Sequence, residues 1–520
     1  MTKSILFLLL ALSSEILFSF KKKSSEEQRP NIVYIMSDDH AYQAISAYGS
    51  GLNNTPNIDR LAHEGALFTR GFVTNSLCAP SRAVLLTGKF NHLNGRIDNL
   101  ESVFDQGQMT FPKLLQKAGY QTALVGKLHL AGNPQGFDYW NILPGQGNYY
   151  NPDFIEMGVK KQIPGYVTSL TTQFALNWLD KRNKSKPFCL LLHQKAPHRN
   201  WLPEEKYLSL YEDKDIPFPD NFFDDYKGRG TAAQTQEMEV VKHMDWGHDM
   251  KFENDPYTGK PTSFMQDIKR FNPEQLKAWQ TAYHGRNEAF LKNKPEGKDL
   301  AKWKYQRYIR DYLKCIKSVD DGVGQVLDYL KANGLDKNTI VIYTSDQGFY
   351  LGEHGWFDKR FMYEESMRTP LLMRYPKEIK AGTVISDLVQ NLDYAPTILD
   401  YAGLKKPSEM QGESFRKLAA GKPVKDWRKA LYYHYYEYPA VHQVKRHYGI
   451  RTERYKLIHF YYDVDEWELY DLQKDPHEMK SIYDDPDYGK VRKVLHTQLN
   501  ELRKKYKDSP GLMETFPSKN

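Results

Sequence analysis

Short apolar runs separated by longer amphipathic stretches recur along this chain. Residues 31–36, 121–125, 187–192 and 338–343 are each almost continuously apolar. Runs of this length are typical of strands buried on both faces of a parallel sheet. Residues 305–330 instead repeat apolar side chains at helical spacing, which predicts an amphipathic helix packed on that sheet. The pattern therefore predicts an α/β fold whose doubly wound sheet gathers the strand ends along one edge.

The composition changes twice along the chain. Residues 211–304 are polar and aromatic with scattered prolines. This composition predicts an insertion that contains no long helix or strand and that covers the functional site at the edge of the sheet. Beyond Gly403 the chain is rich in aromatic and β-forming residues, and a last helix is predicted around residues 491–505, which together indicate a small antiparallel sheet with one helix. The predicted domains are a signal peptide (1–23), a catalytic domain (24–425) and a smaller C-terminal α+β subdomain (426–520).

The apolar segment at residues 5–20 follows Lys3 and resembles a secretory signal peptide, being short for a membrane span. We therefore expect export to the periplasm or medium without stable membrane insertion. The formal charge of +7 falls to about +4 without the four lysines and one glutamate of this leader. Such a weak bias fits an anionic substrate and argues against nucleic acid as a partner.

Polar side chains follow two of the predicted strands where each strand ends. Asp38 and Asp39 come directly after the run at 31–36, and Asp346 and Gln347 follow the run at 338–343 closely. Any one of these acids alone is most simply a helix cap or a turn residue. Together they form an all-oxygen set suited to a hard divalent cation, with Ca²⁺ preferred and Mg²⁺ second.

The stretch from Cys78 to Gly88 combines a thiol with a nearby fixed cation. Pro80 fits the first turn of a helix and Gly88 fits its end, so Cys78 is predicted at the amino end of a short helix. Arg82 follows by four residues and shares its helical face. A lone cysteine is usually a small buried hydrophobe, as Cys189 is expected to be, and a thiolate phosphatase would place its arginine further from the cysteine. The chain has three cysteines, which permits at most one disulfide if Cys78 is modified.

The whole string Cys-x-Pro-Ser-Arg-x-x-x-Leu-Thr-Gly from Cys78 resembles the signature of the formylglycine sulfatases. The resemblance implies an alkaline-phosphatase-like fold, with a large mixed, mostly parallel sheet flanked by helices. It also implies that a formylglycine-generating enzyme converts Cys78 to 3-oxoalanine (formylglycine). The metal ligands that it implies are Asp38, Asp39, Asp346, Gln347 and the modified residue 78. Many family members have Asn where this chain has Gln347, so the resemblance implies the ligand role for this longer side chain but leaves the coordination geometry open.

Further matches to the family supply cations and proton carriers. Gly126-Lys127-Leu128-His129 resembles a second sulfatase signature, and Lys127 and His129 point to the same side if the backbone stays extended. His198, after Pro197, resembles the histidine that protonates the leaving group. His193 lies inside the predicted strand and is expected to be structural.

A later loop resembles the sulfate-binding segment of the family. Lys359 corresponds to the family's sulfate-binding lysine. Its neighbours Asp358 and Arg360 are expected to bind sugar hydroxyls, because carboxylate and guanidinium accept and donate hydrogen bonds respectively. A surface ion pair is the alternative for these two. His442 or His447, predicted on a loop between strands, could reach the same pocket, although a structural role is the simpler interpretation of each. We name His447 as the candidate substrate contact. In the long helix, Asp320 and Asp321 are expected to be solvated or paired along the helix and not to be metal ligands.

The resemblance implies hydrolysis of a sulfate monoester. A hydroxyl of the hydrated aldehyde attacks sulfur, His198 protonates the departing sugar oxygen and His129 takes a proton to release the sulfate. Residues 132–140, 144–147, 150–152 and 345–349 look most like bacterial exo-acting sulfatases of host glycans and glycosaminoglycans, with 6-O-sulfated N-acetylglucosamine as the first choice. Another sulfated hexosamine, or an iduronate or galactose sulfate, stays open. The alternatives are a phosphoester or phosphonate monoester hydrolase and a non-catalytic calcium-dependent glycan-binding protein.

Overall fold

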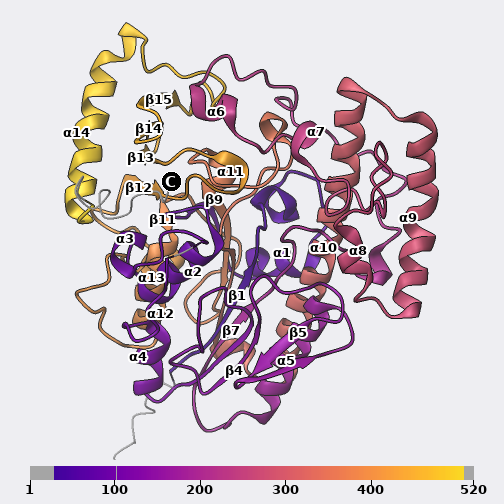
Figure 1. Cartoon of the computed structure of the whole chain (residues 1–520). Coiled ribbons are helices and arrows are strands. Elements are labelled where there is room, and N and C mark those ends of the chain that lie inside the picture. The colour runs from indigo at the N-terminus through magenta and orange to yellow at the C-terminus, as the bar shows by residue number, and fades with distance from the viewer. Residues whose placement is uncertain (1–28, 101, 509–520) are drawn as a thin grey trace, which may run out of the picture.

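The structure is a computed structural model that describes residues 29–100 and 102–508. The predicted signal peptide, residues 1–23, lies outside the described residues. Within the described chain an eleven-stranded sheet occupies the centre of the molecule (Figure 1). Its strands, in spatial order, are β10 (Thr383–Ile385), β2 (Ala66–Phe72), β9 (Arg368–Arg374), β8 (Thr339–Ser345), β1 (Asn31–Ser37), β7 (Phe188–His193), β3 (Gln121–Lys127), β4 (Tyr139–Leu143), β5 (Asp153–Glu156) and β6 (Val159–Gln162), with β11 (Val389–Gln390) also paired to β2.

The four apolar runs of the sequence form the middle of this sheet. Strands β8, β1, β7, β3 lie side by side and all run parallel. Their residues are buried because helices cover both faces, which explains why they read as continuous apolar runs. Strand β9 between β2 and β8, and strands β5 and β6 at one edge, pair antiparallel. The predicted large mixed, mostly parallel sheet is confirmed.

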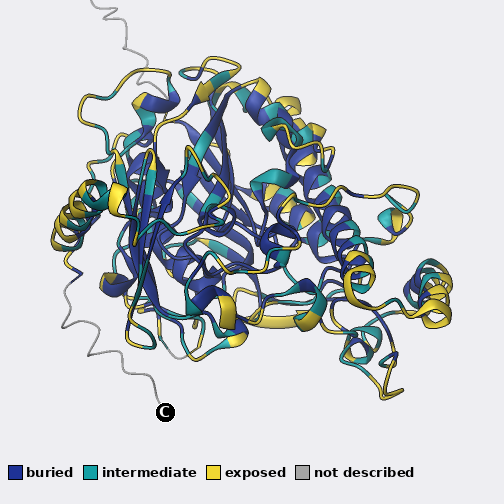
Figure 2. Cartoon of the chain, turned by 90° about the horizontal axis from the view of Figure 1, so that it is seen from above, coloured by how far each residue is buried: buried dark blue, intermediate teal, exposed yellow. Residues whose placement is uncertain are grey.

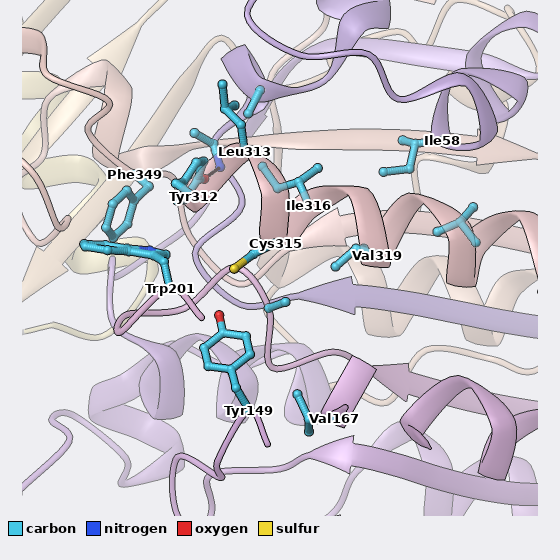
Figure 3. Packing of buried hydrophobic residues seen from close by; sticks show 14 of the residues in the cluster. Ile58, Tyr149, Val167, Trp201, Tyr312, Leu313, Cys315, Ile316, Val319 and Phe349 are labelled. Carbon is cyan, nitrogen blue, oxygen red and sulfur yellow. Dashed lines mark hydrogen bonds between the residues drawn. The ribbon is translucent and has the colours of Figure 1, made fainter. Parts of the chain in front are cut away.

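Two layers of helices cover the sheet, and the dark buried interior lies between them (Figure 2). One core packs beneath α1, α5 and α10, and the other beneath α2, α4 and α12. Figure 3 shows Trp201, Tyr312 and Phe349 together in the first core, and the last two rings stack at 5.5 Å. The α-helices are α1 (Pro56–His63), α2 (Cys78–Thr87), α3 (Asn91–Asn94), α4 (Phe111–Lys117), α5 (Val167–Lys181), α6 (Thr231–Thr235), α7 (Val240–His243), α8 (Phe264–Ile268), α9 (Pro273–Asn293), α10 (Gly297–Ala332), α11 (Glu364–Met367), α12 (Tyr394–Tyr401), α13 (Arg416–Ala419) and α14 (Gly489–Lys505).

A second, four-stranded antiparallel sheet follows α13 in the chain and confirms the expected small sheet with one helix. Helix α14 packs on this sheet through Leu495 and Leu499. A shared cluster that includes Phe72, Trp356 and Tyr433 joins the two sheets. The domain boundary at residue 426 stays a prediction. The strands are β12 (Ala430–Tyr435), β13 (His447–Thr452), β14 (Tyr455–Phe460) and β15 (Glu466–Asp471).

The segment 211–304 was expected to lack long elements, and this expectation is wrong. It contains α9, a helix of 21 residues, and the start of α10, which appear beside α8 at the right of Figure 1. Pro273 occupies the first turn of α9, where its missing N–H costs nothing. Asn272 and Gln275 form a capping box at the start of this helix. The proline therefore starts the helix instead of breaking it.

Of the two alternatives predicted for Asp320, the solvated position is wrong and the pairing along the helix is confirmed, because Lys317 Nζ lies 3.6 Å from Asp320 Oδ2. Asp320 also has a further contact that was not predicted. It is buried on α10, and its carboxylate accepts hydrogen bonds from the backbone N–H groups of Asn57 (3.0 Å) and Ile58 (2.9 Å). These N–H groups belong to the first turn of α1, which has no partner for them within its own helix. Asp320 thus ties α1 to α10. None of the helices in the described parts of the chain combines the length and the apolarity that a membrane crossing needs.

Candidate active site

The candidate site lies where the carboxyl ends of the central parallel strands meet the amino end of α2. The last residues of β1 and β8, Ser37 and Ser345, are register partners, so the residues that follow the two strands emerge side by side. The backbone N–H of Asp39 donates to Oδ1 of Asp346 at 3.2 Å. The sheet edge predicted from the two apolar runs therefore brings together the acids that follow them.

Three carboxylates form the centre of the site. One oxygen from each of Asp38, Asp39 and Asp346 lies within 4.8 Å of the other two, and all three side chains are buried. Asp39 adopts a left-handed backbone conformation with φ of 66°, which is uncommon for a residue other than glycine. Buried carboxylates in such proximity need positive charge or hydrogen-bond donors around them.

Each of these carboxylates has a cationic partner from another element of the fold. The partners come from the end of β3, from the loop before α11 and from α2. All are buried, so these ion pairs are shielded from water and salt. The pairs are Lys127 Nζ with Asp38 Oδ2, Lys359 Nζ with Asp39 Oδ1 and Oδ2 (2.6 and 2.7 Å), and Arg82 Nε and Nη2 with Asp346 Oδ2 (2.9 and 2.7 Å).

The three carboxyl groups differ in their electrostatics. Burial alone would raise the pKa of Asp38, but Lys127 and other nearby cations hold it well below its ordinary value. Burial and the neighbouring charge of Asp38 raise the pKa of Asp346 to about 7, against the opposing effect of Arg82. Burial likewise raises the pKa of Asp39. The raised pKa values of Asp39 and Asp346 indicate that Lys359 and Arg82 do not fully offset the cost of burying these carboxylates, so an added cation would stabilise their ionised forms.

The donor atoms fit a hard divalent metal ion. Asp38 Oδ1 and Gln347 Oε1 are buried and have no hydrogen-bond partner among the described residues. The amide nitrogen of Gln347 donates to Asp39 Oδ1, so the side chain of the predicted fourth ligand lies within the carboxylate cluster. Carboxylate and amide oxygens are the ligands that Ca²⁺ and Mg²⁺ prefer. Asp38, Asp39, Asp346 and Gln347 are therefore the residues that could hold such an ion.

Cys78 lies at the edge of this cluster as the first residue of α2. The helix ends at Thr87, and Gly88 caps it with φ of 62°, as the sequence predicts. The Sγ atom of Cys78 is 3.6 Å from Nε2 of Gln347. Burial raises the pKa of the Cys78 thiol, so at neutral pH the side chain is a thiol and not the thiolate that a cysteine-dependent phosphatase uses. The residue thus faces the metal ligands without being a reactive cysteine itself.

Two of the predicted histidines border the same space. His198 Nε2 lies 3.7 Å from Asp39 Oδ2, and its Nδ1 contacts the carbonyl oxygen of Arg199. His129 Nε2 lies 3.3 Å from the Gln146 amide nitrogen. Burial and the charge of Lys127 lower the pKa of both imidazoles well below the ordinary value, so both are neutral here. An arriving anion would raise both pKa values again.

The extended backbone that was expected to align Lys127 with His129 does not continue. Strand β3 ends at Lys127, and His129 has a left-handed φ of 58°. Gln146 nevertheless bridges the two side chains, because its Oε1 accepts from Lys127 Nζ at 2.5 Å and its amide nitrogen contacts His129. His193 is buried in β7, and its Nδ1 lies 3.1 Å from the carbonyl oxygen of Lys127, which agrees with a structural position.

The residues proposed for sugar contacts form a connected group beside Lys359. Arg360 Nε donates to Asp358 Oδ1 at 3.0 Å, and its Nη1 donates to Glu437 Oε1 at 2.9 Å. His442 Nε2 lies 3.4 Å from the other oxygen of Asp358. Asp358, Arg360 and His442 all have positive φ values. The pair is buried, so the alternative of a surface ion pair is wrong.

His447 does not lie on the expected loop. It is the first residue of β13 and is buried, with its ring stacked on Tyr433, Tyr435 and Phe361 at centroid distances of 5.6, 5.2 and 5.8 Å. An imidazole enclosed by rings in a strand is part of the packing between the two sheets. Of the two candidates, His442 is the one that contacts the predicted sugar-binding residues, and the naming of His447 is corrected.

Two residues of the site were missed by sequence reasoning. Gln146 joins Lys127 and His129, and Glu437 joins Arg360 to the backbone N–H of Asn99 at 2.6 Å. Gln146 belongs to the Pro-Gly-Gln-Gly segment that carried part of the resemblance, which was the available signal for it. Glu437 lies 77 residues from Arg360 in a loop after β12, and nothing in its local sequence marks it.

Two family models match the chain. The model described as Sulfatase matches residues 30–404, and the model described as N-sulphoglucosamine sulphohydrolase, C-terminal, matches residues 352–505. Among curated proteins, an N-acetylglucosamine-6-O-sulfatase of Bacteroides thetaiotaomicron is 50% identical over 98% of this chain and 92% of its own length. A human N-acetylglucosamine-6-sulfatase is 27% identical over 78% of this chain and 67% of its own length.

Solved structures give the same picture of the fold. BT4656, solved in complex with its substrate D-glucosamine-2-N,6-O-disulfate, is 50% identical and superposes with a TM-score of 0.90 over 93% of this chain and 99% of that chain. A phosphonate monoester hydrolase of Agrobacterium radiobacter has a TM-score of 0.70 over 92% of this chain and 96% of that chain at 21% identity, which shows a shared fold alone.

Proposed function

The chain belongs to the sulfatase family, and we propose that it removes the 6-O-sulfate from N-acetylglucosamine, or a closely related sulfated glucosamine, at the end of a sulfated glycan. As a family member it is a sulfuric ester hydrolase. The relative that is 50% identical carries the name N-acetylglucosamine-6-O-sulfatase, and the solved relative at the same identity binds a glucosamine that carries a 6-O-sulfate. These similarities support the substrate class.

The observation that carries the proposal is the convergence at the sheet edge. Cys78, a cluster of three carboxylates and the cations Lys127, Arg82 and Lys359 meet in one buried place, although they come from five separate parts of the chain. A sulfate monoester is hydrolysed only when charge that builds on the sulfur oxygens is stabilised and the alkoxide is expelled with a proton. The site provides fixed positive charge for the first requirement and the imidazole of His198 for the second.

We assign separate tasks to the charged side chains. Once Cys78 has been oxidised, the hydrated formylglycine would supply the hydroxyl nucleophile. Asp38, Asp39, Asp346 and Gln347 would hold Ca²⁺, which would contribute further positive charge to the site. Lys127 and Lys359 hold sulfate oxygens through their ammonium groups, and Arg82 favours the ionised form of Asp346 and holds it in place through two hydrogen bonds. Because these groups are buried and fixed, they need little reorganisation when the negative charge shifts during the reaction.

The two histidines divide the proton transfers. The carbonyl of Arg199 accepts a hydrogen bond from Nδ1 of His198, which leaves Nε2 directed at the site as the atom that protonates the departing sugar oxygen. His129 lies on the other side with Lys127 and Gln146, and it takes the proton whose removal allows the enzyme-bound sulfate to leave.

The sugar ring is bound by the group next to Lys359. Asp358 accepts and Arg360 donates hydrogen bonds, so together they can fix one hydroxyl of the ring. His442 extends this group, because its Nε2 faces Asp358. We further propose that the chain is exported before it acts and that a formylglycine-generating enzyme modifies it.

The test is desulfation of defined sugars by protein made in a host with a formylglycine-generating enzyme. N-Acetylglucosamine 6-sulfate should be hydrolysed. N-Acetylglucosamine 3-sulfate and galactose 6-sulfate serve as controls and should not be hydrolysed. The mass of the peptide with residue 78 should be lower than that of the thiol form by the conversion of CH₂SH to CHO. Cys78→Ala should abolish turnover without unfolding the protein. Faster turnover of a phosphonate ester with the same leaving group would instead support the phosphonate hydrolase.

A further inference from the structure

Arg96 is a buried cation beside the site with no role in the proposed chemistry. It follows α3, and its side chain is 8% exposed. Its Nε has no hydrogen-bond partner, and no ion pair of its guanidinium occurs among the described residues within 4.0 Å. The buried Nε without a partner is costly, because the water that would solvate it has been removed. Such a side chain indicates a ligand that supplies the missing negative charge.

The acids near Arg96 are already engaged elsewhere. Glu437 accepts from Arg360 Nη1 at 2.9 Å and from the backbone N–H of Asn99 at 2.6 Å. Oδ1 of Asp98 accepts from Oγ of Ser102 at 2.8 Å. Burial lowers the pKa of Arg96 even though both acids act in the opposite direction. Among the residues that the structure describes, the charge of Arg96 is therefore only partly compensated.

The backbone places Arg96 at the amino end of α2, next to residue 78. The side-chain amide of Asn91 donates both to the carbonyl oxygen of Pro80 at 2.9 Å and to that of Arg96 at 2.8 Å. Two residues further on, Oδ1 of Asn99 accepts from the backbone N–H of Ala79 at 3.1 Å. The segment from Arg96 to Asn99 thus lies along the start of α2.

The same segment connects to the sugar-binding group. Asn99 reaches Arg360 through Glu437, and the charge of Arg96 contributes to the low pKa of His129. Arg96 consequently lies within electrostatic range of the sulfate-cleaving centre on one side and of the sugar-binding residues on the other. Lys127 and Lys359, which are paired with the central carboxylates, are already assigned to the scissile sulfate, so a second anion needs another cation.

We propose that Arg96 binds a second anionic substituent, a sulfate on the same sugar that carries the scissile 6-O-sulfate. This inference rests on the proposed function. The planar fork of a guanidinium matches two oxygens of a sulfate, whereas a neutral acetamide offers only one carbonyl acceptor. Arg96 therefore makes the enzyme prefer N-sulfated over N-acetylated glucosamine 6-sulfate. It is a specificity residue and takes no part in bond breaking.

The experiment compares N-acetylglucosamine 6-sulfate with glucosamine 2-N,6-O-disulfate as substrates of the mature enzyme and of Arg96→Gln. We expect the ratio of kcat/KM for the disulfate to that for the monosulfate to fall about tenfold, mainly through KM, because charged hydrogen bonds are lost only with the disulfate. Arg96→Lys keeps the charge and should retain part of the preference. Lys89→Gln removes the same charge at the far end of α2 and should leave the ratio unchanged. Melting temperatures of all variants confirm that they fold.

The outcomes separate this inference from the proposed function. If the wild-type enzyme hydrolyses both sugars and Arg96→Gln changes both rates equally or not at all, the role of Arg96 is refuted and the proposed function stands. If Lys89→Gln lowers the ratio as much as Arg96→Gln, the preference reflects overall charge, and the inference again fails. If the wild-type enzyme hydrolyses neither sugar, the proposed function fails first.

Discussion

Replacing His198 tests the division of labour between the two histidines. Its Nδ1 is held by the carbonyl of Arg199, and the Tyr149 hydroxyl donates to the His198 carbonyl at 2.6 Å, so ring and backbone are both fixed. Only Nε2 can give a proton to a departing oxygen. A positioned general acid contributes about 10²- to 10⁴-fold to such a step, which is about 3 to 5 kcal/mol of transition-state stabilisation.

The loss in His198→Ala should depend on the leaving group. A sugar alkoxide is a strong base and needs the proton, so kcat/KM for N-acetylglucosamine 6-sulfate should fall about 10³-fold. An aryl sulfate with a nitrophenolate leaving group departs without a proton, so its kcat/KM should fall less than about tenfold. The assay is steady-state hydrolysis of both esters by the wild-type protein and the variant at one pH, with released sulfate as the common readout.

His129→Ala serves as the matched control. This residue acts after the sugar has left, so its removal should slow both esters to a similar degree and cause a burst of the first product. Equal losses for both esters in His198→Ala, or a leaving-group dependence that appears in His129→Ala instead, would show that the assignment is wrong.

Three further predictions concern metal, packing and pH. Chelation should lower both activity and melting temperature, and Ca²⁺ should restore them more fully than Mg²⁺. The melting temperature of Asp346→Asn should change less on chelation than that of the wild type. Equal restoration by both ions would contradict the preference for Ca²⁺. Asp320→Ala should lower the free energy of unfolding by about 2 kcal/mol in urea titrations, because two N–H groups of α1 lose their acceptor, whereas exposed Asp328→Ala should change little. Burial raises the pKa of Glu478 to about 7, against the opposing charge of Lys456, so this carboxyl's contribution to stability falls as pH rises from about 4.5 to 7. The stability of Glu478→Gln relative to wild type should therefore rise between pH 5 and pH 8, and a constant difference would refute this.

Local sequence was sufficient for those parts of the site that follow directly from a strand or a helix start. The acids after β1 and β8 and the thiol at the start of α2 needed only apolar runs, a proline and a glycine to be placed. Fold class followed for the same reason, because burial on both faces leaves its mark in every residue of a central strand. The roles of these residues still depend on the family resemblance and on the experiments above.

Contacts between distant segments could not be predicted in this way. His442 precedes strand β13 and His447 begins it. Only the packing of the second sheet shows that the His442 ring faces Asp358, whereas the His447 ring is enclosed by aromatic rings. Asp320 reads as an exposed helical acid until α1 is docked against α10. Glu437 has no local signature, because its place in the site depends on its contact with the distant residue Arg360. Sequence patterns report the local environment along one element, whereas these positions are defined by a second element.

The backbone of the site shows a further reason why its geometry escapes local rules. Asp39, His129, Asp358, Arg360 and His442 all have φ values between 58° and 92°, a conformation that disfavours side chains with a Cβ. Glycine would relieve this strain at each position but would remove the carboxylate, imidazole or guanidinium. Such conformations cost of order 1 kcal/mol or more each and persist only where surrounding contacts determine them. The buried ion pairs around Asp39 and Asp358 supply those contacts. The charge network therefore both forms the site and holds its backbone in a shape that the sequence alone would not favour.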